Sequence, residues 1–358
     1  MTEALAPPAL QTGLHGHEAA ERRFLAAWAE GRLHHGWLIT GPAGVGKATL
    51  AFRIARALRA APEPARAPDT LEVAPEHPAF RRIAAGAEPG LAVLSPAEGA
   101  AHIGIDEVRA LTAFFTKTLP DGGWRVAIVD SADALTVPAA NAALKLLEEP
   151  PARAVLLLVA HRPAALLATI RSRCRRLALA PLGPAAMERA LAAAGLTAAN
   201  PAALAELAGG SVGRAMAIEA AGGGALYADL VAILGGLPRL DRARMTALAD
   251  SVAGREAEAR FALLVDLVET LLARAARHGA GHPPAVEACA GEAALLARLS
   301  PDPPAARLWA DIAASLPAEA RASRALNLDA PALILDMLRR IEEQATRLPA
   351  LQDGPPAR

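Results

Sequence analysis

Lysine is almost absent from this chain of 358 residues. Lys47, Lys117 and Lys145 stand among 37 basic residues, so arginine carries nearly all of the positive charge. Because 37 acidic residues bring the formal net charge to zero, the surface as a whole does not attract nucleic acid or membrane. Any contact with DNA therefore has to be local, and the arginines of residues 171–176 form a candidate strip for it.

Cysteine is equally scarce. Cys174 and Cys289 have no second cysteine or histidine at metal-ligand spacing, which favours neither a disulfide framework nor a zinc site. Long apolar runs are missing too, since none reaches the roughly eighteen residues of a membrane span, and the opening residues lack the pattern of an export signal. We therefore expect a cytoplasmic protein in a reducing compartment, without a membrane partner.

The apolar content of 53% is enough for the cores of two or three domains. The short apolar runs GWLIT, WRVAIVD and AVLLLVA are typical of strands covered on both faces, and helical patterns lie between them. This alternation predicts a doubly wound α/β fold with a parallel sheet that extends to about residue 180. Short helices and then longer amphipathic patterns follow. We expect an α/β domain at 14–181, a small helical lid at 182–224 and a helical collar or oligomerisation domain at 225–346.

Three stretches lack clear periodicity. Residues 1–12 and 347–358 contain proline, and we expect them to fray and to carry no function. Residues 61–100 are rich in proline and alanine, which predicts a surface insertion followed by one short strand, LAVLS.

The turn between the first strand and the next helix is rich in glycine. Gly41, Gly44 and Gly46 let backbone N–H groups point inward at an anion, and the positive end of the following helix adds to the attraction. Lys47 can reach the β and γ phosphates of a nucleotide, so the pattern GxxxxGK is complete. The alternative is a turn that joins strand to helix and binds no ligand.

Two neighbouring positions lack the groups that hydrolysis needs. A serine or threonine after the lysine would ligate Mg²⁺, but the residue is Ala48, and Thr49 lies about 100° further round the helix. Asp130, at a strand end, is placed to hold Mg²⁺ indirectly, whereas Ser131 stands where an acid would orient the attacking water. Asp133 comes two positions later and is expected to face elsewhere. The pattern therefore favours nucleotide binding without efficient hydrolysis.

Two further blocks resemble a known family. NAALKLLEEPP at 141–151 and TIRSRC at 169–174 are similar to the bacterial replication clamp-loader family of AAA+ proteins. The opening block from GHEAAERRF to LITGP and the stretch IGIDEVRAL share this similarity, which covers about residues 14–220. The resemblance implies a P-loop AAA+ domain with a helical lid and a helical collar that holds the chain in a hetero-oligomeric ring.

The resemblance also implies roles for single residues. In that family the SRC arginine, here Arg173, reaches the γ-phosphate bound by a neighbouring subunit. Arg214 resembles an arginine that some members direct from the lid at a bound nucleotide. The polar residue that senses nucleotide at a strand end is replaced by Ala160 or His161. Relatives often carry a four-cysteine zinc module, but residues 61–80 contain no cysteine, so we expect no zinc and no other metal site.

Ala48 and Ser131, where a metal ligand and a water-activating acid are missing, make the chain resemble a subunit of this family that hydrolyses little ATP. The resemblance implies that ATP or ADP binds weakly or not at all. Its implied work is to help load the sliding clamp on primed DNA beside gamma/tau and delta subunits, itself neither polymerase nor efficient ATPase. One alternative is an ATP-hydrolysing gamma/tau-type motor in which Thr49 and Asp133 compensate. Another is a non-replicative AAA+ switch or adaptor, and a duller interpretation takes Arg173 and Arg214 as ordinary solvated arginines.

Overall fold

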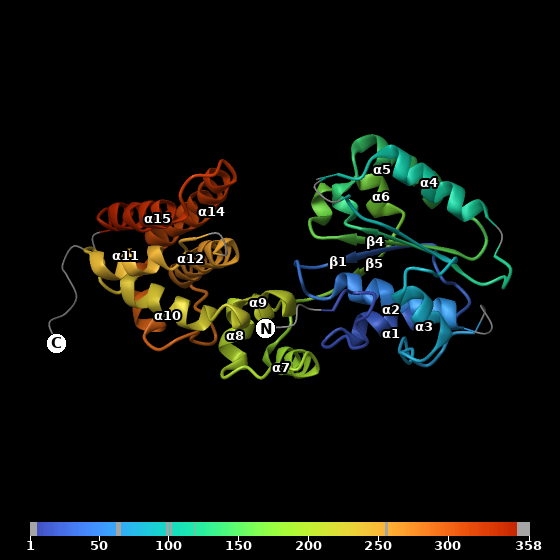
Figure 1. Cartoon of the computed structure of the whole chain (residues 1–358), viewed down its shortest axis with the longest axis horizontal. Helices are drawn as coiled ribbons and strands as arrows, with labels where there is room; N and C mark the ends of the chain where they lie inside the picture. Colours follow the sequence, from blue (N-terminus) through green and yellow to red (C-terminus); the bar gives the residue numbers. More distant parts are fainter. Residues whose placement is uncertain are drawn as a thin grey trace. The chain divides into compact units, whose positions relative to one another are not determined.

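A computed structural model describes residues 6–61, 66–97, 100, 102–117, 119–254 and 257–348. Contacts divide the chain into two compact units, both drawn in Figure 1. The first comprises residues 1–197 and 210–213, and the second comprises 198–209 and 214–358. The predicted lid is shared between them, because α7 (Pro184–Ala193) belongs to the first unit and α8 (Pro201–Leu207) to the second. The division into three domains stays a prediction.

The first unit is built on one parallel sheet. Its strands are β1 (Gly36–Thr40), β2 (Leu91–Leu94), β3 (Arg125–Asp130), β4 (Ala154–Ala160) and β5 (Arg175–Ala178). They lie in the order β2-β3-β4-β1-β5, and each pair is parallel. Ligands of such sheets bind outside the carboxyl ends of the strands, where the strand order reverses. The end of β1 is therefore the expected binding position.

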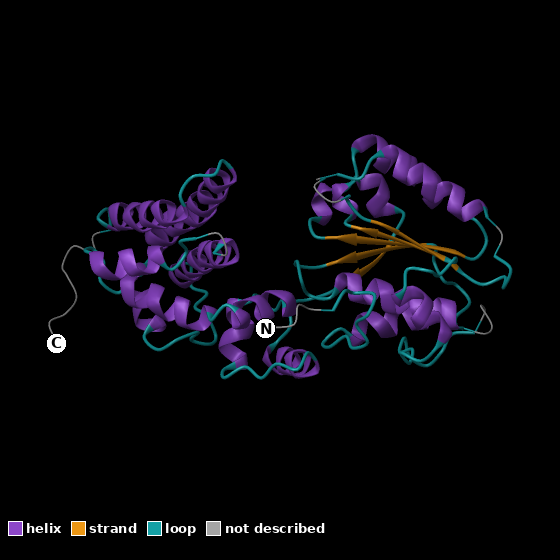
Figure 2. Ribbon diagram, viewed as in Figure 1, coloured by secondary structure: helices purple, strands orange, loops and turns teal. Residues whose placement is uncertain are grey.

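Helices cover both faces of this sheet (Figure 2). One face carries α1 (Glu18–Ala29), α2 (Lys47–Ala60) and α3 (Pro78–Ala84), and the other carries α4 (Ile105–Thr116), α5 (Val137–Glu148) and α6 (Ala168–Ser172). Single-turn 3-10 helices at Ala132–Ala134 and Pro163–Ala165 follow β3 and β4. Every residue of β1 and β4 is buried, which explains their continuous apolar runs. The predicted doubly wound α/β fold is confirmed.

One strand is not evident from the sequence. β5 has a single buried residue, Leu177, so it lacks the apolar signal of the other strands, although the sheet was expected to extend to about residue 180. Pairing with β1 holds it in place, from Trp37 beside Arg175 to Thr40 beside Ala178. Within residues 61–100, the described part forms α3 and the edge strand β2.

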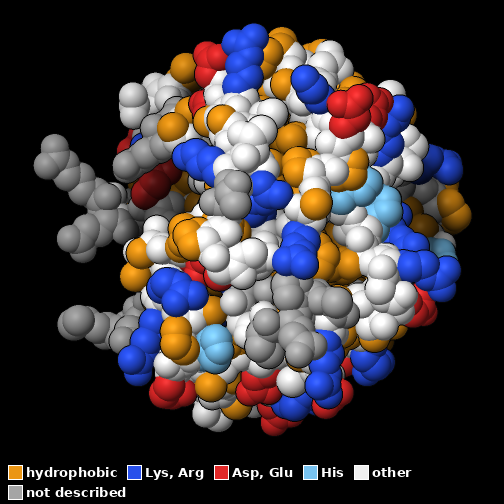
Figure 3. Space-filling model, turned by 90° about the vertical axis from the view of Figure 1, so that its right-hand side faces the viewer, with side chains coloured by type: hydrophobic (Ala, Val, Ile, Leu, Met, Phe, Trp, Pro, Cys, Tyr) orange, Lys and Arg blue, Asp and Glu red, His pale blue; other side chains and the backbone are white. Residues whose placement is uncertain are grey.

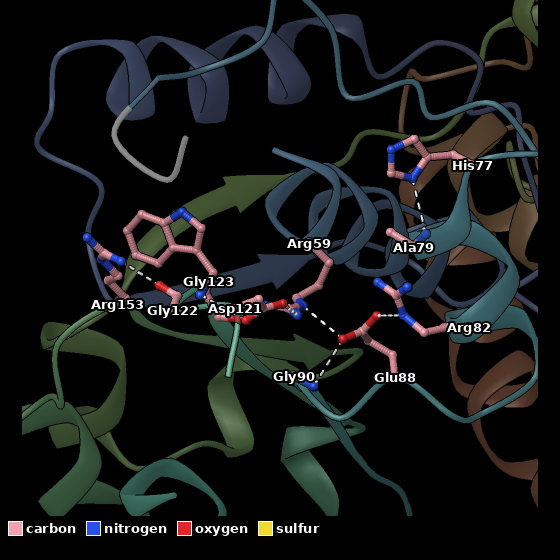
Figure 4. Close-up of polar contacts among 11 residues, drawn as sticks. Arg59, His77, Ala79, Arg82, Glu88, Gly90, Asp121, Gly122, Gly123 and Arg153 are labelled. Carbon is pink, nitrogen blue, oxygen red and sulfur yellow. Dashed lines mark hydrogen bonds and ion pairs between the residues drawn. The ribbon is translucent and has the colours of Figure 1, made fainter. Parts of the chain in front are cut away.

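A buried ion network joins the end of α2 to the amino ends of β2 and β3 (Figure 4). Arg59 donates to Glu88 at 3.0 Å and to Asp121 at 2.5 Å. It also donates to the carbonyl oxygen of Trp124 at 2.8 Å, and Arg82 donates to the second oxygen of Glu88 at 2.7 Å. The side chains of Arg59 and Glu88 are 2% and 1% exposed, so this central pair is part of the core, whereas Asp121 and Arg82 lie at its surface.

The second unit is entirely helical in its described residues. Besides α8 it contains most of α9 (Val212–Ala220), then α10 (Gly223–Leu234), α11 (Arg242–Asp250), α12 (Glu258–Gly279), α13 (Glu292–Leu299), α14 (Pro303–Ala325) and α15 (Ala330–Ala345). The long helices α12 and α14 pack together, and α15 packs against α11 and α14. Among the described helices none is long and apolar enough alone to span a membrane; α9 and α10 meet that criterion as a pair bent by 79°.

A second buried ion network holds this helical unit together. Arg274 of α12 donates to Glu292 of α13 at 2.6 Å and to Glu206 of α8 at 2.8 Å. The hydroxyl of Tyr227, on α10, donates to the same Glu292 carboxylate at 2.5 Å. These charges are therefore paired where four helices meet, as buried charges must be.

Candidate functional site

The glycine loop runs from Gly41 to Gly46, between β1 and α2. Gly41, Gly44 and Gly46 have φ angles of +151°, +72° and +104°, which residues with a side chain rarely adopt. A Cβ at Gly41 would lie 2.4 Å from the carbonyl oxygen of Leu179, and one at Gly46 would lie 2.7 Å from the side chain of Leu14. Side chains are therefore excluded at both ends of the loop, and its backbone keeps the conformation that directs N–H groups at an anion.

Lys47, the first residue of α2, is 3% exposed. Its Nζ donates to the carbonyl oxygens of Gly41 at 2.8 Å and Pro42 at 2.5 Å, both in its own loop. Burial lowers the pKa of this ammonium, and the charges of Asp130 and Asp133 oppose that shift. Among the described residues no carboxylate forms an ion pair with it. An anion placed in the loop would stabilise this charge.

A cavity of about 510 Å³ lies at the carboxyl edge of the sheet, in the size range of small-molecule sites. Its walls come from the glycine loop and α2, from the ends of β3 and β4, from α7, and from the segment before α1. The predicted site residues that line it are Gly44, Gly46, Lys47, Thr49 and Asp130. Gly41 supports the loop from behind, against Leu179.

The N-terminal segment corrects a prediction. Residues 6–12 were expected to fray, but they lie along α2 and contribute to the cavity wall. Arg56 donates to two carbonyl oxygens of the segment at 2.9 and 2.5 Å, and Arg53 donates to that of Thr12. Two buried arginines at helical spacing need acceptors, and this signal in the sequence was missed. Residues 1–5 and 349–358 lie outside the described part of the chain.

The two aspartates after β3 have different surroundings. Asp130 lines the cavity, and burial raises its pKa, while His161 and Lys47 act in the opposite direction. Asp133 instead accepts hydrogen bonds from the backbone N–H of His161 at 3.0 Å and of Arg162 at 3.3 Å. Its carboxylate therefore caps the turn after β4, a local role that occupies both oxygens.

The end of β4 distinguishes the two candidates for the nucleotide-sensing position. Ala160 is fully buried within the strand, whereas His161 lines the cavity. Burial lowers the pKa of His161, as does the charge of Lys47, so the imidazole is predominantly neutral at pH 7. Of the two, only His161 faces the cavity, and the sensor position itself stays a prediction.

Three arginines of the strip at residues 171–176 contact acceptor groups of their own unit. Arg171 donates to the carbonyl oxygen of Leu166 at 2.5 Å, and Arg176 donates to the hydroxyl of Thr40 at 2.9 Å. Arg173, which follows α6, lies 2.9 Å from Glu148 and keeps 39% of its side chain exposed. On the face drawn in Figure 3, basic, acidic and apolar side chains are interspersed. Local contacts of single arginines are therefore more important here than a broad basic field.

Arg214 belongs to the second unit. Its guanidinium donates to the hydroxyl of Thr270 at 2.7 Å and to the carbonyl oxygen of Asp266 at 3.3 Å, both on α12. Its predicted role towards a nucleotide stays a prediction.

Among the described residues no three His, Cys, Asp or Glu side chains are arranged to hold a metal ion. Burial raises the pKa of Cys174 to about 12 and that of Cys289 to about 11, so neither thiol is ionised near neutral pH. Cys174 is a partly buried side chain that packs beside Gly36. The expectation of no zinc stays a prediction.

The order of the strands, the GxxxxGK loop after β1 and the aspartate at the end of β3 define a P-loop α/β domain. Residues 16–183 match the family described as DNA polymerase III, delta subunit. This match covers 168 of the 358 residues, slightly less than half of the chain.

Individual relatives show the same connection. The chain is 41% identical over 153 residues to DNA polymerase III subunit delta' of Pseudomonas aeruginosa, which covers 42% of this chain and 45% of the relative. It is 31% identical over 192 residues to DNA polymerase III subunit gamma/tau of Mycobacterium bovis, and this alignment covers 52% of this chain and 31% of the relative. A gamma subunit-related protein of Thermotoga maritima aligns over 90% of this chain and 99% of its own, with 16% identity and a TM-score of 0.36. The chain thus spans less than half of the delta' relative's length.

Proposed function

We propose that this chain acts as a delta'-type subunit of a bacterial clamp loader, which helps to place the sliding clamp on primed DNA and hydrolyses little ATP itself. One observation carries the proposal: the phosphate loop is complete, while Asp133, the acid nearest to the water-activating position, caps the turn after β4. Ala48 and Ser131 stand where a metal ligand and an acid would be needed. The delta' relatives support the same assignment.

ATP or ADP fits this site as a ligand. The N-terminus of α2 has no side-chain cap, so the first-turn N–H groups and those of the loop are available as donors to phosphate oxygens. Lys47 adds a positive charge, and the exclusion of side chains at Gly41 and Gly46 keeps the loop open to an anion. A bound nucleotide supplies a phosphoanhydride, and this chain's residues hold it without the groups that activate water.

Arg173 is the residue that acts on catalysis, in trans. A guanidinium that reaches the γ-phosphate of a neighbouring subunit raises the rate of transfer by about 10³ to 10⁵. The neighbours are gamma/tau and delta subunits in the cytoplasm, and the helical second unit holds the chain in the ring. Clamp and primed DNA are reached through the complex.

Two turnover measurements test the proposal. The isolated chain should show Mg²⁺-dependent ATP hydrolysis near background, and a reconstituted loader carrying Arg173→Ala should lose turnover at the site next to this chain. Arg109→Ala is a matched control, because Arg109 is exposed and pairs with Asp106 of its own helix. Fast hydrolysis by the isolated chain that Lys47→Ala abolishes would rule the proposal out, as would purification from cells without other loader subunits.

A gamma/tau-type motor is the second candidate, and one observation favours it. Thr49 lines the cavity together with Lys47 and Asp130, so it borders the space that a nucleotide would occupy. In a motor, Thr49→Val would remove most of the turnover of the isolated chain. In the delta'-type subunit, there is little turnover to remove.

A further inference from the structure

Arg173 is engaged by two acceptors of its own unit. Its Nη2 lies 2.9 Å from Oε1 of Glu148, and its Nη1 donates to the carbonyl oxygen of Thr169 at 3.2 Å. Glu148 is the last residue of α5, and Arg173 is the residue that ends α6. The contact therefore joins the ends of two helices that lie on the same face of the sheet.

The backbones that carry this pair are fixed in place. A Cβ at Gly36 would lie 2.6 Å from the side chain of Leu147 and 3.4 Å from the carbonyl oxygen of Arg173, so both helix ends pack against the start of β1. His35 binds the carbonyl oxygen of Leu147 through Nε2 at 2.8 Å. The backbone N–H of Arg173 donates to Ile170 at 3.1 Å. The ion pair is therefore formed by side chains on a rigid support.

The exposure of the pair argues against a role in stability. The side chains of Arg173 and Glu148 are 39% and 50% exposed, and ion pairs with such exposure contribute little to folding. Arg171, two residues earlier, shows the contrast, because it donates to the carbonyl oxygens of Pro163, Ala164 and Leu166 and thereby fixes a turn.

What the pair changes is the freedom of the guanidinium. An arginine side chain has several rotatable bonds, and it loses that freedom when it binds a phosphate in one geometry. The carbonyl oxygen of Thr169 takes one of its five N–H donors and the Glu148 carboxylate holds the group by its charge, which leaves other N–H groups for a second ligand. An arginine held in this way needs less ordering when a neighbouring phosphate arrives.

We infer that Glu148 is a positioning residue for Arg173, which holds the guanidinium ready for the phosphate of an adjacent subunit. This inference rests on the proposed trans role of Arg173. Glu148 touches neither nucleotide nor reacting atoms, and its effect passes through the arginine. Glu149, the next residue, is exposed, and its side chain forms no hydrogen bond or ion pair within the described part of the chain, so it serves as a matched control.

The test uses the reconstituted loader and the share of its kcat that Arg173→Ala removes. Glu148→Ala should remove more than half of that share, with the KM for ATP unchanged, because the arginine is needed in the transition state and not for binding ATP. Glu148→Gln should restore most of it, because an amide oxygen at the same position, 2.9 Å from Nη2, can accept a guanidinium N–H. Glu149→Ala should have no effect. Size-exclusion chromatography of each loader shows whether assembly is complete.

The outcomes separate this inference from the function on which it rests. If Arg173→Ala leaves turnover unchanged, the trans role fails and the inference fails with it. If Arg173→Ala lowers turnover but Glu148→Ala does not, or raises it, the positioning role is wrong while the trans role stands. Equal losses in Glu148→Ala and Glu148→Gln would also overturn it. Should Glu148→Ala fail to assemble, the ratio of kcat for Glu148→Gln and Glu149→Ala decides, with near-equality expected.

Discussion

The helix α2 carries a buried basic residue at each end, and the two are held in opposite ways. Arg59, in the last turn, contacts the carboxylates of Glu88 and Asp121. Lys47, at the first position, is bound by the carbonyl oxygens of Gly41 and Pro42. The helix dipole favours a cation at the C-terminal end and disfavours one at the N-terminal end. Arg59 is therefore stabilised by both its partners and its position, and Lys47 by neither its position nor a carboxylate in contact.

We propose that this difference separates a structural charge from a functional one. Arg274 resembles Arg59, since it is buried and paired with Glu292 and Glu206, and both arginines connect several elements of their units. Within the described part of the chain, the hydrogen bonds of the Lys47 side chain stay in its own loop. Proteins retain such an unfavourable arrangement where a ligand, and not the fold, supplies the compensating charge.

The largest effect is expected at the C-terminal end of α2. Arg59→Ala leaves the Glu88 carboxylate, 1% exposed, without its main partner and should lower the free energy of unfolding by about 3–5 kcal/mol. Urea denaturation followed by circular dichroism measures it. Arg82→Ala, which removes the 44% exposed partner of the same carboxylate, should cost about 1 kcal/mol or less. Equal losses in the two variants would contradict the distinction drawn for Arg59.

Asp133→Ala gives the next largest effect, on stability and not on turnover. The side chain is 6% exposed and accepts two backbone N–H groups, and hydrogen bonds to a charged group are worth about 1.5–3 kcal/mol. Asp130→Ala is the control, because the raised pKa of Asp130 shows that its charge is unfavourably buried, so its removal should cost less. A stable Asp133→Ala variant with altered ATP turnover would assign Asp133 to catalysis instead.

His17, which contacts the loop before α2, should also make the stability of the protein depend on pH. His17 is 4% exposed, its Nε2 donates to the carbonyl oxygen of Val45 at 2.8 Å, and burial lowers its pKa. The unfolded chain then binds more protons than the folded one, so stability falls as pH drops below about 6.5, by up to about 1.4 kcal/mol per pH unit. His35 and His161, whose pKa values burial also lowers, add the same sign. The free energy of unfolding should differ less between pH 7.5 and pH 5.5 in His17→Gln than in the unmodified protein. An equal difference in the two proteins would exclude His17 as the source of the pH dependence.

The smallest effect on stability is expected at Lys47. Lys47→Ala removes a buried charge from the unfavourable end of α2 and two hydrogen bonds to carbonyl oxygens, and the change should stay within about 1 kcal/mol. Titration calorimetry with ADP should at the same time show that binding is lost. A loss of stability as large as that of Arg59→Ala would mean that Lys47 is structural after all.

Local patterns made much of the α/β unit predictable. β1, β3 and β4 are buried on both faces, so their apolar runs are visible in the sequence, and GxxxxGK places the loop between β1 and α2. Gly44, Gly46, Lys47, Thr49 and Asp130 meet at one edge because strand ends of a parallel sheet do so. Spacing alone therefore located the cavity.

The remaining features depend on contacts between distant elements. β5 exists because it pairs with β1, not because its residues are apolar. The segment 6–12 is ordered by Arg53 and Arg56 of α2, and no pattern within the segment itself indicates this. Likewise, the ion pair of Arg173 with Glu148 joins side chains from two helix ends, which spacing along the chain does not reveal.

The two glycines that bracket β1 have a mechanical consequence. A Cβ at Gly36 would approach the carbonyl oxygen of Arg173, and one at Gly41 would clash with that of Leu179. The neighbouring strand β5 is therefore packed against β1 just before its first residue and just after its last. β1 is thus a strand of fixed length, five residues or about 17 Å. The phosphate loop lies at one end of it, and the turn formed by the SRC residues 172–174 lies at the other. Alanine at position 48 and serine at position 131 leave the phosphate-loop end without a metal ligand and an acid, yet they do not change the length of β1.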